Sequence, residues 1–433
     1  MSFISGEDQS MKCTRIHAAV AAAFLAPAAA FAQSFNAVDT IPWPSTGRFP
    51  AYPVNAPRPT EVWAQAGVVY DNNVFRLSKN ADTRALLGND TRSDTIGRFG
   101  AGIRHEQLIA GRQRVRLEAR GDQYQYSNNS LLNHFEYGLR GEWLWEFTND
   151  LSGTVGIERR TRLIDLAQQQ RPVKDLITED HAFVNGAFRL GPTIRLRSSL
   201  DGTRAKHDDT TRATGDLRST TITGGVDYVT PLNNSVGLEA RRTNGTAPTA
   251  DLLNPTVLVQ NDFHENEVAV VARVTGSPQI TGTGRVGRTT RHNEQFPGQD
   301  FRGTTWRASV DWTPLQKTGF EFALYKEPRS IIDIAASYVV ANGASFGPRW
   351  APTEKLVLSA LFLRERQQYV GGIVPAGTPQ RDETVRSVRF GVGWEPRRFV
   401  ELSAGYEHGV RSSNALLRDF DFDAVMANAR FRF

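Results

Sequence analysis

Apolar and polar side chains alternate along most of this chain with a period of two residues. The segment from Arg114 to Asp122 shows the pattern most clearly, because its apolar residues share one parity and its charged residues the other. A helix would mix the two sets, whereas a strand places them on opposite faces. The segment is therefore predicted to be a strand with one apolar and one charged face.

The following segments repeat this pattern with aromatic residues on the apolar parity. Between residues 135 and 147 that parity holds Phe135, Tyr137, Leu139, Trp143, Trp145 and Phe147. Residues 306–312 and 388–394 continue it. Tryptophan and tyrosine favour the boundary between hydrocarbon and headgroups, so aromatics near the strand ends are typical of the girdles of a transmembrane barrel. A soluble β-sandwich also alternates, but it rarely carries so many aromatics there.

Short and long connections alternate between these segments. The short ones lie near Gly111, Asn149, Gly191–Pro192, Pro231–Asn234, Gly276–Pro278, Pro314–Lys317, Pro348–Glu354 and Pro396–Arg397. Long polar connections are expected at residues 71–93, 163–180, 203–218, 243–262 and 367–381. Eight hairpins and one strand at each end predict an all-β, antiparallel, up-and-down transmembrane barrel of about 18 strands at residues 62–433. Sixteen strands is the alternative, because residues 331–346 are less regular.

The facing of each strand is strongly determined if the segments lie in a membrane. A slip of one residue between Arg114 and Asp122 would turn three arginines toward lipid, at about 2–4 kcal/mol each near the midplane. The total rivals the roughly 5–15 kcal/mol by which a whole domain is stable.

Bulk composition hides this architecture. With 39% hydrophobic residues, 22% charged residues and a mean hydropathy of −0.40, the chain of 433 residues resembles a soluble protein. A barrel needs lipophilic side chains only at alternate positions, so its mean hydropathy stays low. Beyond the N-terminus no run of about 18 apolar residues occurs, so a spanning helix is not expected.

The N-terminus predicts export to the outer membrane of a Gram-negative cell. Lys12 and Arg15 precede an Ala-rich apolar run, and Ala30–Ala32 has the form of a signal-peptidase site. We expect a signal peptide at residues 1–32, with residues 1–10 as an upstream extension from an alternative start, and a Pro-rich periplasmic segment at residues 33–61. A buried Ala-rich helix is the alternative. The single cysteine, Cys13, would be removed with the signal, which excludes disulfides and thiolate sites from the mature chain.

The last predicted strand ends on an aromatic residue. Phe431 and Phe433 share the apolar parity, with Arg430 and Arg432 on the other. This ending resembles the terminal signal that the barrel-assembly machinery reads, and the alternative is a chance final phenylalanine. Outer-membrane lipid and this machinery are thus expected partners.

Arginine dominates the basic residues, with 44 of the 51. Those at predicted inward positions include Arg114, Arg116, Arg120, Arg140, Arg195, Arg197, Arg241, Arg273, Arg285, Arg307, Arg389 and Arg430. Guanidinium groups bind carboxylates and phosphates at two points, so one hypothesis is a wide lumen that favours anions, including an acidic polysaccharide. The alternative is a cross-strand ladder in which Glu118, Glu142, Glu239 and Asp311 pair with arginines and stiffen the wall. The spread of charge argues against nucleic-acid binding.

Motifs for catalysis, metals or cofactors are missing from the sequence. The eight histidines show no metal-ligand spacing, and no HExxH, GxSxG or Walker motif occurs. Asp208–Asp209 and Asp421–Asp423 are acid pairs, but adjacency alone does not give the spacing that a working pair needs. We expect no enzyme, no cofactor and no metal.

Particular residues resemble a known family. GVVYDNNVFRLS at residues 67–78 and SDTIGRFGAGI at residues 93–103 are similar to the opening of EpsL-type outer-membrane proteins, which are associated with exosortase-linked exopolysaccharide biosynthesis. Residues 111–126, and RPVKDLITED before HAFVNGAFRLGP, extend the likeness. The family is similar to the broader group of β-barrel porins. The resemblance implies a barrel that supports synthesis or export of a polysaccharide together with periplasmic export components, and it supplies no catalytic residues.

The preferred function is therefore a porin-like conduit with an arginine-rich lumen for exopolysaccharide. One rival is a surface lectin or adhesin whose long loops bind glycan. Another is a general solute porin, which would pass small sugars independently of any polysaccharide.

Overall fold

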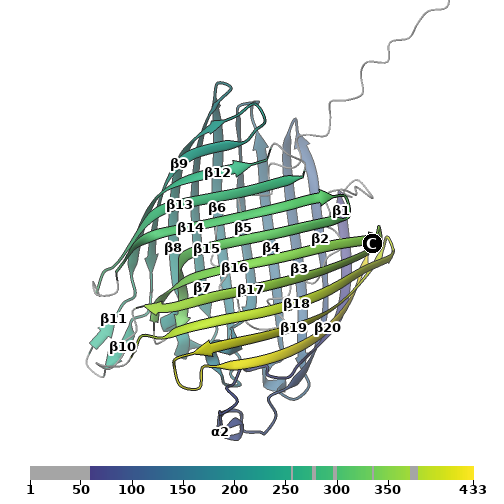
Figure 1. Ribbon diagram of the computed structural model, residues 1–433, viewed down its shortest axis with the longest axis vertical. Coiled ribbons are helices and arrows are strands. Elements are labelled where there is room, and N and C mark those ends of the chain that lie inside the picture. Colours follow the sequence, from purple (N-terminus) through teal and green to yellow (C-terminus); the bar gives the residue numbers. More distant parts are fainter. Residues whose placement is uncertain (1–58, 255–256, 276–278, 296–299, 334–335, 371–378) are drawn as a thin grey trace, which may run out of the picture. The chain divides into compact units, whose positions relative to one another are not determined.

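The computed structural model describes residues 59–254, 257–275, 279–295, 300–333, 336–370 and 379–433 (Figure 1). In these residues eighteen strands form one antiparallel sheet. They are β1 (Thr60–Asp71), β2 (Asp94–Ala110), β3 (Gln113–Tyr126), β4 (His134–Glu146), β5 (Leu151–Leu163), β6 (Leu176–Leu190), β7 (Ile194–His207), β8 (Leu217–Val229), β9 (Ser235–Thr246), β12 (Phe263–Val274), β13 (Ile280–Asn293), β14 (Phe301–Leu315), β15 (Thr318–Asp333), β16 (Ala336–Thr353), β17 (Leu356–Val370), β18 (Asp382–Arg397), β19 (Val400–Ser413) and β20 (Phe420–Arg432). A separate hairpin comprises β10 (Asp251–Asn254) and β11 (Val257–Val259).

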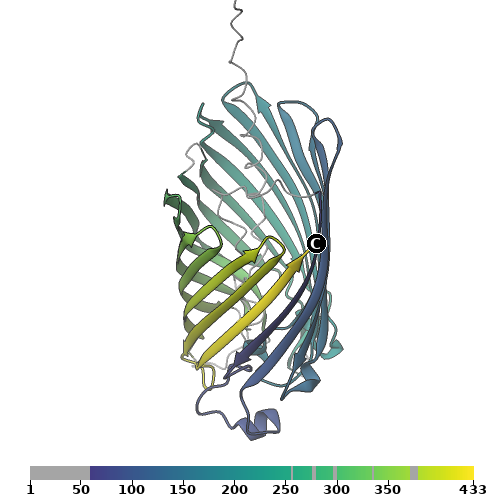
Figure 2. The same cartoon turned by 90° about the vertical axis from the view of Figure 1, so that its right-hand side faces the viewer.

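The sheet closes on itself. Each strand pairs with its neighbours along the chain, β9 pairs with β12, and β1 pairs with β20 in a register that sets Trp63 opposite Arg432 and Tyr70 opposite Val425. Figure 2 shows the strands crossing the wall at a slant, as closure of a barrel requires. The predicted fold class and the count of eighteen are confirmed, and the alternative count of sixteen is wrong. Within the less regular region, residues 331–333 end β15 and residues 336–346 begin β16.

Five of the short connections lie where the sequence predicts them, and the one at Gly276–Pro278 lies outside the described residues. The prediction at Pro348–Glu354 was wrong by several residues, because β16 continues to Thr353 and the turn lies at residues 354–355. Pro396 and Arg397 are the last residues of β18, and the turn follows them at residues 398–399. The other rim carries the longer connections, with α2 (Thr83–Leu87), η2 (Ser130–Leu132), α3 (Leu166–Gln169) and η3 (Thr210–Gly215). No helix in the described part of the chain is long and apolar enough to cross a membrane. The predicted signal peptide and almost all of the Pro-rich segment fall outside that part.

The predicted strand ends at the long-loop rim were wrong by several residues. β6 begins at Leu176, β7 runs to His207, and β17 runs to Val370, so the loops between these strands are shorter than expected. The ladder continues there, with Ile177 opposite His207. Apolar and polar residues are no longer separated by parity at this level, as at Leu176 and Ile177, so alternation disappears from the sequence although the backbone pairing persists.

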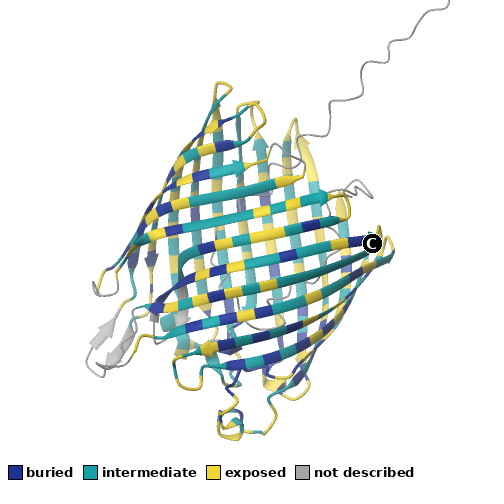
Figure 3. Cartoon of the chain, viewed as in Figure 1, coloured by how far each residue is buried: buried dark blue, intermediate teal, exposed yellow. Residues whose placement is uncertain are grey.

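The two faces of the wall differ as predicted. On β3, Leu117 points outward and is 52% exposed, whereas its neighbour Arg116 points inward and pairs with Glu142. Figure 3 shows burial alternating in this way along the strands. Hydrophobic residues are exposed and charged residues are covered, the reverse of a soluble domain, so the outer face is built for hydrocarbon.

An aromatic row runs across the outer face from β14 to β18. Ring centroids of Trp312 and Phe320 lie 5.4 Å apart, those of Phe322 and Phe346 lie 4.9 Å apart, and Phe346 and Phe362 are stacked at 6.1 Å. All project from the half of the strands nearer the short turns. Stacked aromatic pairs on adjacent strands stabilise the sheet and form part of the girdle that the sequence predicts.

An arginine placed on the outer face should disrupt the barrel. We expect Leu117→Arg to lower the free energy of unfolding in lipid vesicles by about 2–4 kcal/mol, because the guanidinium would face hydrocarbon. Ser152→Arg, which introduces the same group at an inward position of β5, is the control and should have little effect. Equal losses for the two variants in denaturant titrations would contradict the assigned facing.

Candidate functional site: the lumen wall

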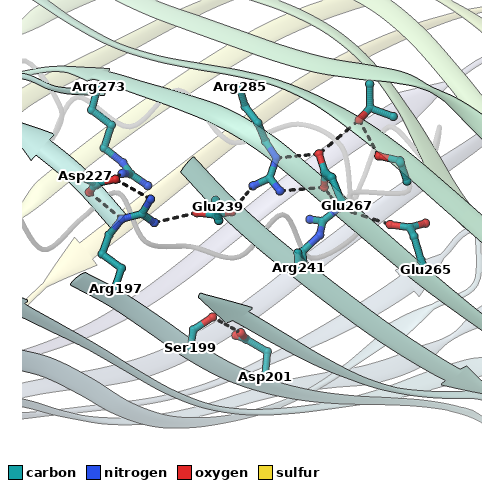
Figure 4. Close-up of polar contacts among 12 residues, drawn as sticks. Arg197, Ser199, Asp201, Asp227, Glu239, Arg241, Glu265, Glu267, Arg273 and Arg285 are labelled. Carbon is teal, nitrogen blue, oxygen red and sulfur yellow. Dashed lines mark hydrogen bonds and ion pairs between the residues drawn. The ribbon is translucent and has the colours of Figure 1, made fainter. Parts of the chain in front are cut away.

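A chain of ion pairs runs across the inner face of β7, β8, β9 and β13. The Nε atom of Arg197 lies 2.7 Å from Asp227 Oδ2, and its Nη1 lies 2.7 Å from Glu239 Oε2 (Figure 4). Glu239 also accepts from Arg285 Nη1 at 2.5 Å. One arginine thus joins two carboxylates and one carboxylate joins two arginines, which links neighbouring strands through their side chains.

The chain continues onto β12. Arg285 Nη2 lies 2.8 Å from Glu267 Oε2, and Arg241 Nη2 lies 2.7 Å from the same oxygen. Arg241 also reaches Glu265 at 3.4 Å (Figure 4). We call this chain of ion-paired side chains the charge ladder. Its members, in order across the wall, are Asp227, Arg197, Glu239, Arg285, Glu267, Arg241 and Glu265.

Strand parity and small residues position the charge ladder. All its members occupy inward positions, and the register sets Glu267 directly opposite Arg241. Two inward glycines leave room for the side chains. A Cβ atom at Gly237 would lie 2.3 Å from Asp227 Oδ1, and one at Gly225 would lie 3.1 Å from Arg197 Nη2. Larger residues at either position would displace the ion pair.

Carboxylates of the lumen wall lie beneath the arginines. In the Arg285–Glu267 pair the arginine side chain is 25% exposed and the glutamate 3%. Arg195 keeps a similar exposed edge while its partner Asp227 is fully buried. Arg116 and Arg140 likewise cover Glu142. In these pairs the charges balance and the groups that meet the lumen are mainly guanidinium edges, whereas in the Asp311–Arg349 pair the carboxylate is the more exposed partner.

The structure brings most of the twelve predicted arginines to a carboxylate. Eleven of them lie within 4.0 Å of an acidic oxygen, and Arg120 is the one for which the described residues give no such partner. The remaining partners are Glu106 for Arg114 and Arg116, Asp227 for Arg273, Glu327 for Arg307, Glu407 for Arg389 and Glu61 for Arg430. This is the pairing that the ladder interpretation expects.

The four carboxylates that the ladder interpretation names are also paired with arginines, though not always with the expected ones. Glu142 and Glu239 contact predicted arginines, whereas Glu118 pairs with Arg104 at 2.9 Å and Asp311 pairs with Arg349 at 3.0 Å. Arg104 and Arg349 were missed, as was Asp227. Their inward parity was visible in the sequence, but the choice of partner depends on cross-strand register, which the sequence does not specify.

A second polar group on the inner wall joins tyrosines to buried glutamates. Tyr325 and Arg329 both donate to Glu365, and Tyr369 donates to Glu383 at 2.9 Å. Arg381 lies 3.8 Å above the Tyr369 ring and 2.7 Å from Glu383. Both glutamates are fully buried, so each depends on these donors for its solvation.

At the long-loop rim, loops fold into the mouth of the barrel. Leu166 and Ala167 of the α3 segment, residues 164–175, are buried although they lie in a connection. Gln170 Nε2 donates to the carbonyl of Leu417 at 3.2 Å, and Arg411 Nη2 donates to the carbonyl of Ala167 at 3.2 Å. These contacts join the β5–β6 connection to β19 and the β19–β20 connection, so this segment narrows the entrance from the long-loop side.

A buried ion pair anchors the neighbouring loop. Arg76 lies in the left-handed region, with a φ of 53°, and its Nη2 lies 2.8 Å from Asp71 Oδ2 with both side chains covered. Its guanidinium stacks 3.5 Å from the Phe422 ring, inside an apolar cluster that includes Leu166 and Tyr124. Gln170 Nε2 donates to the carbonyl of Arg76 at 2.9 Å, which joins this loop to the α3 segment.

The Asp175 carboxyl group predicts that the α3 segment is held more stably at low pH. Burial raises the pKa of the Asp175 carboxyl group, while the Asp209 amide donates to it at 3.2 Å. A carboxyl whose folded-state pKa is raised favours folding below its unfolded pKa, and the advantage is lost as pH rises through the folded value. Protection factors for amide exchange at residues 164–175 should therefore fall as pH rises above about 4, the unfolded value of an aspartate. Asp175→Asn should make the protection factors independent of pH in this range, whereas the control Asp150→Asn, at the opposite rim, should leave the dependence unchanged. If Asp175→Asn kept the wild-type dependence, the role assigned to Asp175 would be wrong.

The two acid pairs serve local structure. Asp209 caps η3 by accepting from the Thr211 amide at 2.9 Å. Asp423 accepts from Tyr406 at 2.6 Å and lies 2.9 Å from His408 Nδ1 on the outer face of β20. Within the described ranges, no group of three or more His, Cys, Asp or Glu side chains could hold a metal ion.

Comparison with known proteins agrees with this architecture. The family described as "Putative beta-barrel porin 2" matches residues 264–433, from β12 to the C-terminus. The chain is a closed antiparallel barrel of eighteen strands in its described residues, and its C-terminal part is similar to that porin family. No curated protein matches its sequence. The match does not extend to the narrower resemblance to EpsL-type proteins, which stays a prediction, as do the assembly role of Phe431 and Phe433 and the cleavage near Ala32.

Several solved structures resemble the chain in fold. OpdK of Pseudomonas aeruginosa is 11% identical, with 86% of this chain and 99% of that chain covered and a TM-score of 0.46. OccK9 (OpdG) of the same organism is 9% identical, with 86% and 98% covered and a TM-score of 0.48. OccAB3 of Acinetobacter baumannii is 8% identical, with 86% and 99% covered and a TM-score of 0.46.

Proposed function

We propose that the barrel is a conduit through which an acidic exopolysaccharide crosses the outer membrane. The observation that carries the proposal is the unequal exposure within the wall's ion pairs, in which arginines such as Arg285 and Arg241 keep free edges while Glu267 is covered. Carboxylate or phosphate groups of a passing polymer would meet guanidinium donors, which bind such groups with two parallel hydrogen bonds.

The pairing itself suits passage rather than tight binding. Conduction requires sites that attract the substrate but release it again, and repeated weak sites serve this best. A guanidinium that already holds a wall carboxylate offers its remaining N–H groups with a reduced positive potential. The charge ladder crosses several strands, so a polymer could exchange one arginine for the next. The resemblance of residues 67–78 and 93–103 to EpsL-type proteins supports a polysaccharide as the substrate.

Single-channel recording of the mature protein tests the proposal. We expect anion preference in a KCl gradient, and transient block by an acidic oligosaccharide such as a guluronate hexamer. A neutral hexamer of glucose should block less often. Arg120→Gln should reduce the frequency of block, because Arg120 is an exposed inward arginine without a carboxylate partner in the described residues and its loss leaves no acid unpaired. Arg112→Gln, at the short turn between β2 and β3, is the matched control.

Contrary results would separate the alternatives. Cation preference, or equal block by the two hexamers, would overturn the acidic-polymer conduit. If cells that lack the protein secrete their exopolysaccharide normally while the purified barrel passes small sugars, the general solute porin is the better description.

A further inference from the structure

Basic side chains also form a band on the outside of the wall. They occupy outward positions near the long-loop ends of the strands, and seven are exposed arginines while the lysine is half-exposed. We call them the exterior basic belt, which comprises Arg204, Arg218, Arg242, Arg288, Arg302, Lys326, Arg364 and Arg386. This belt is separate from the charge ladder because the strand parity places the two sets on opposite faces.

Each member of the belt lies on the long-loop side of the apolar residues on the outward face of its strand. On β7 the outward residues Leu196 and Leu200 precede Arg204, and on β17 Leu358 and Phe362 precede Arg364. The apolar runs start at the short turns, so the basic groups lie at the far edge of the apolar surface, toward the long loops. In a barrel oriented with its long loops outside, this is the level of the outer-leaflet headgroups.

Two carboxylates lie on the outer face at this level, Asp180 and Asp382, and each is held by an arginine outside the belt, Arg159 and Arg366 respectively. In the described residues none of its eight members forms an ion pair, and the register sets Arg204 directly opposite Arg218 and Arg364 directly opposite Arg386. Asp180, which lies opposite Arg204, is held by Arg159 at 2.5 Å. Like charges at directly opposite positions destabilise a sheet. Their repetition therefore points to an external anion that bridges them.

The outer surface beside Arg204 and Arg218 is hollowed. A hollow of about 970 Å³ crosses the outward positions of β2 to β8, and it is bordered by Arg204 and Arg218 together with the Arg159–Asp180 ion pair. The register aligns the small residues Gly141, Ala182 and Gly202 in one row with the larger Ile157, so the row forms a depression. The apolar hollow and its basic edge together fit a lipid whose acyl chain lies in the hollow and whose phosphate group contacts the arginines.

We propose that the exterior basic belt is a binding site for lipid A, the phosphorylated glycolipid anchor of the outer leaflet. Guanidinium pairs such as Arg204 with Arg218, and Arg364 with Arg386, bridge its phosphate groups, and one acyl chain occupies the hollow across β2 to β8. Lipid A carries both the phosphates and the several acyl chains that these features require. This site concerns the outer face only and does not depend on what passes through the lumen.

Native mass spectrometry of the detergent-purified mature barrel tests the proposal. We expect bound bis-phosphorylated lipid A to survive gentle activation, and we expect roughly tenfold weaker binding of lipid A from which both phosphates have been removed. Arg204→Gln/Arg218→Gln and Arg364→Gln/Arg386→Gln, made separately, should each weaken binding of the phosphorylated form. Lys317→Gln/Lys355→Gln, which removes two charges at the opposite rim, is the control and should bind like the wild type.

The comparison of the two lipids uses the wild-type barrel, so the test holds even if a variant fails to fold. Equal binding of phosphorylated and dephosphorylated lipid A would overturn the proposal. Equal binding of phosphatidylglycerol would overturn the assignment to lipid A, and wild-type affinity in both arginine variants would overturn the assignment to the belt.

Discussion

Asp227→Asn is expected to lower the free energy of unfolding by about 3–5 kcal/mol, because it removes the charge that three arginines share in a covered part of the wall. Asp227 lies 2.8 Å from Arg195, 2.7 Å from Arg197 and 3.7 Å from Arg273, and its side chain is fully buried. The amide would leave Arg195 and Arg273 with no carboxylate within 4.0 Å in the described residues, beside Arg197, which would keep only Glu239. Denaturant titration of the protein in lipid vesicles measures the loss.

Asp311→Asn is the matched control for this variant. Asp311 is also an inward carboxylate with an arginine partner, Arg349 at 3.0 Å, but its side chain is 42% exposed. An ion pair in contact with water contributes about 0–1 kcal/mol, so the control should change stability little. Similar losses for Asp227→Asn and Asp311→Asn would contradict the view that burial makes the charge ladder important.

Replacing residues 165–170 with a Gly-Ser linker of the same length is expected to raise single-channel conductance by roughly twofold or more, because this segment lies across the mouth of a lumen otherwise wide enough for water. The replacement removes Leu166 and Ala167 from the apolar cluster and the hydrogen bonds of Gln170 to the loops opposite. Planar-bilayer recording measures the change.

The same replacement at residues 210–215 is the control, since η3 contributes no buried residue. Its conductance should match that of the unmodified protein. If the α3 replacement also left conductance unchanged, the α3 segment would not be the constriction, and the narrow point would lie within the charge ladder.

Much of the barrel is predictable from local sequence because a strand's two faces meet different solvents. The alternation from Arg114 to Asp122 specifies both the strand and its facing, and the Gly and Pro residues of the short turns specify where the strands reverse. The same rule places Arg285 and Arg241 inside. These predictions depend on spacing within ten or so residues, and the structure confirms the strands and their antiparallel order. The lumen-lining role of Arg285 and Arg241 stays a prediction.

The features that sequence reasoning missed depend on contacts between distant parts of the chain. Gln170 meets the carbonyl of Leu417 only because the barrel closes, and nothing near Leu166 indicates that it would be buried. The exterior basic belt was hidden for another reason. Arg204 and Lys206 follow the last apolar outward residues of β7, so they read as the start of a polar loop although the ladder continues through His207.

Cysteine accessibility along β3 tests the central claim most directly, namely that alternate residues face water inside the barrel and hydrocarbon outside it. In a Cys13→Ala background, single cysteines at residues 115, 117 and 119 and at residues 116, 118 and 120 would be treated with a charged maleimide in lipid vesicles. We predict rapid labelling at the even positions and protection at the odd ones until detergent or denaturant is added. Labelling that ignores parity, or that favours the odd positions, would contradict the account.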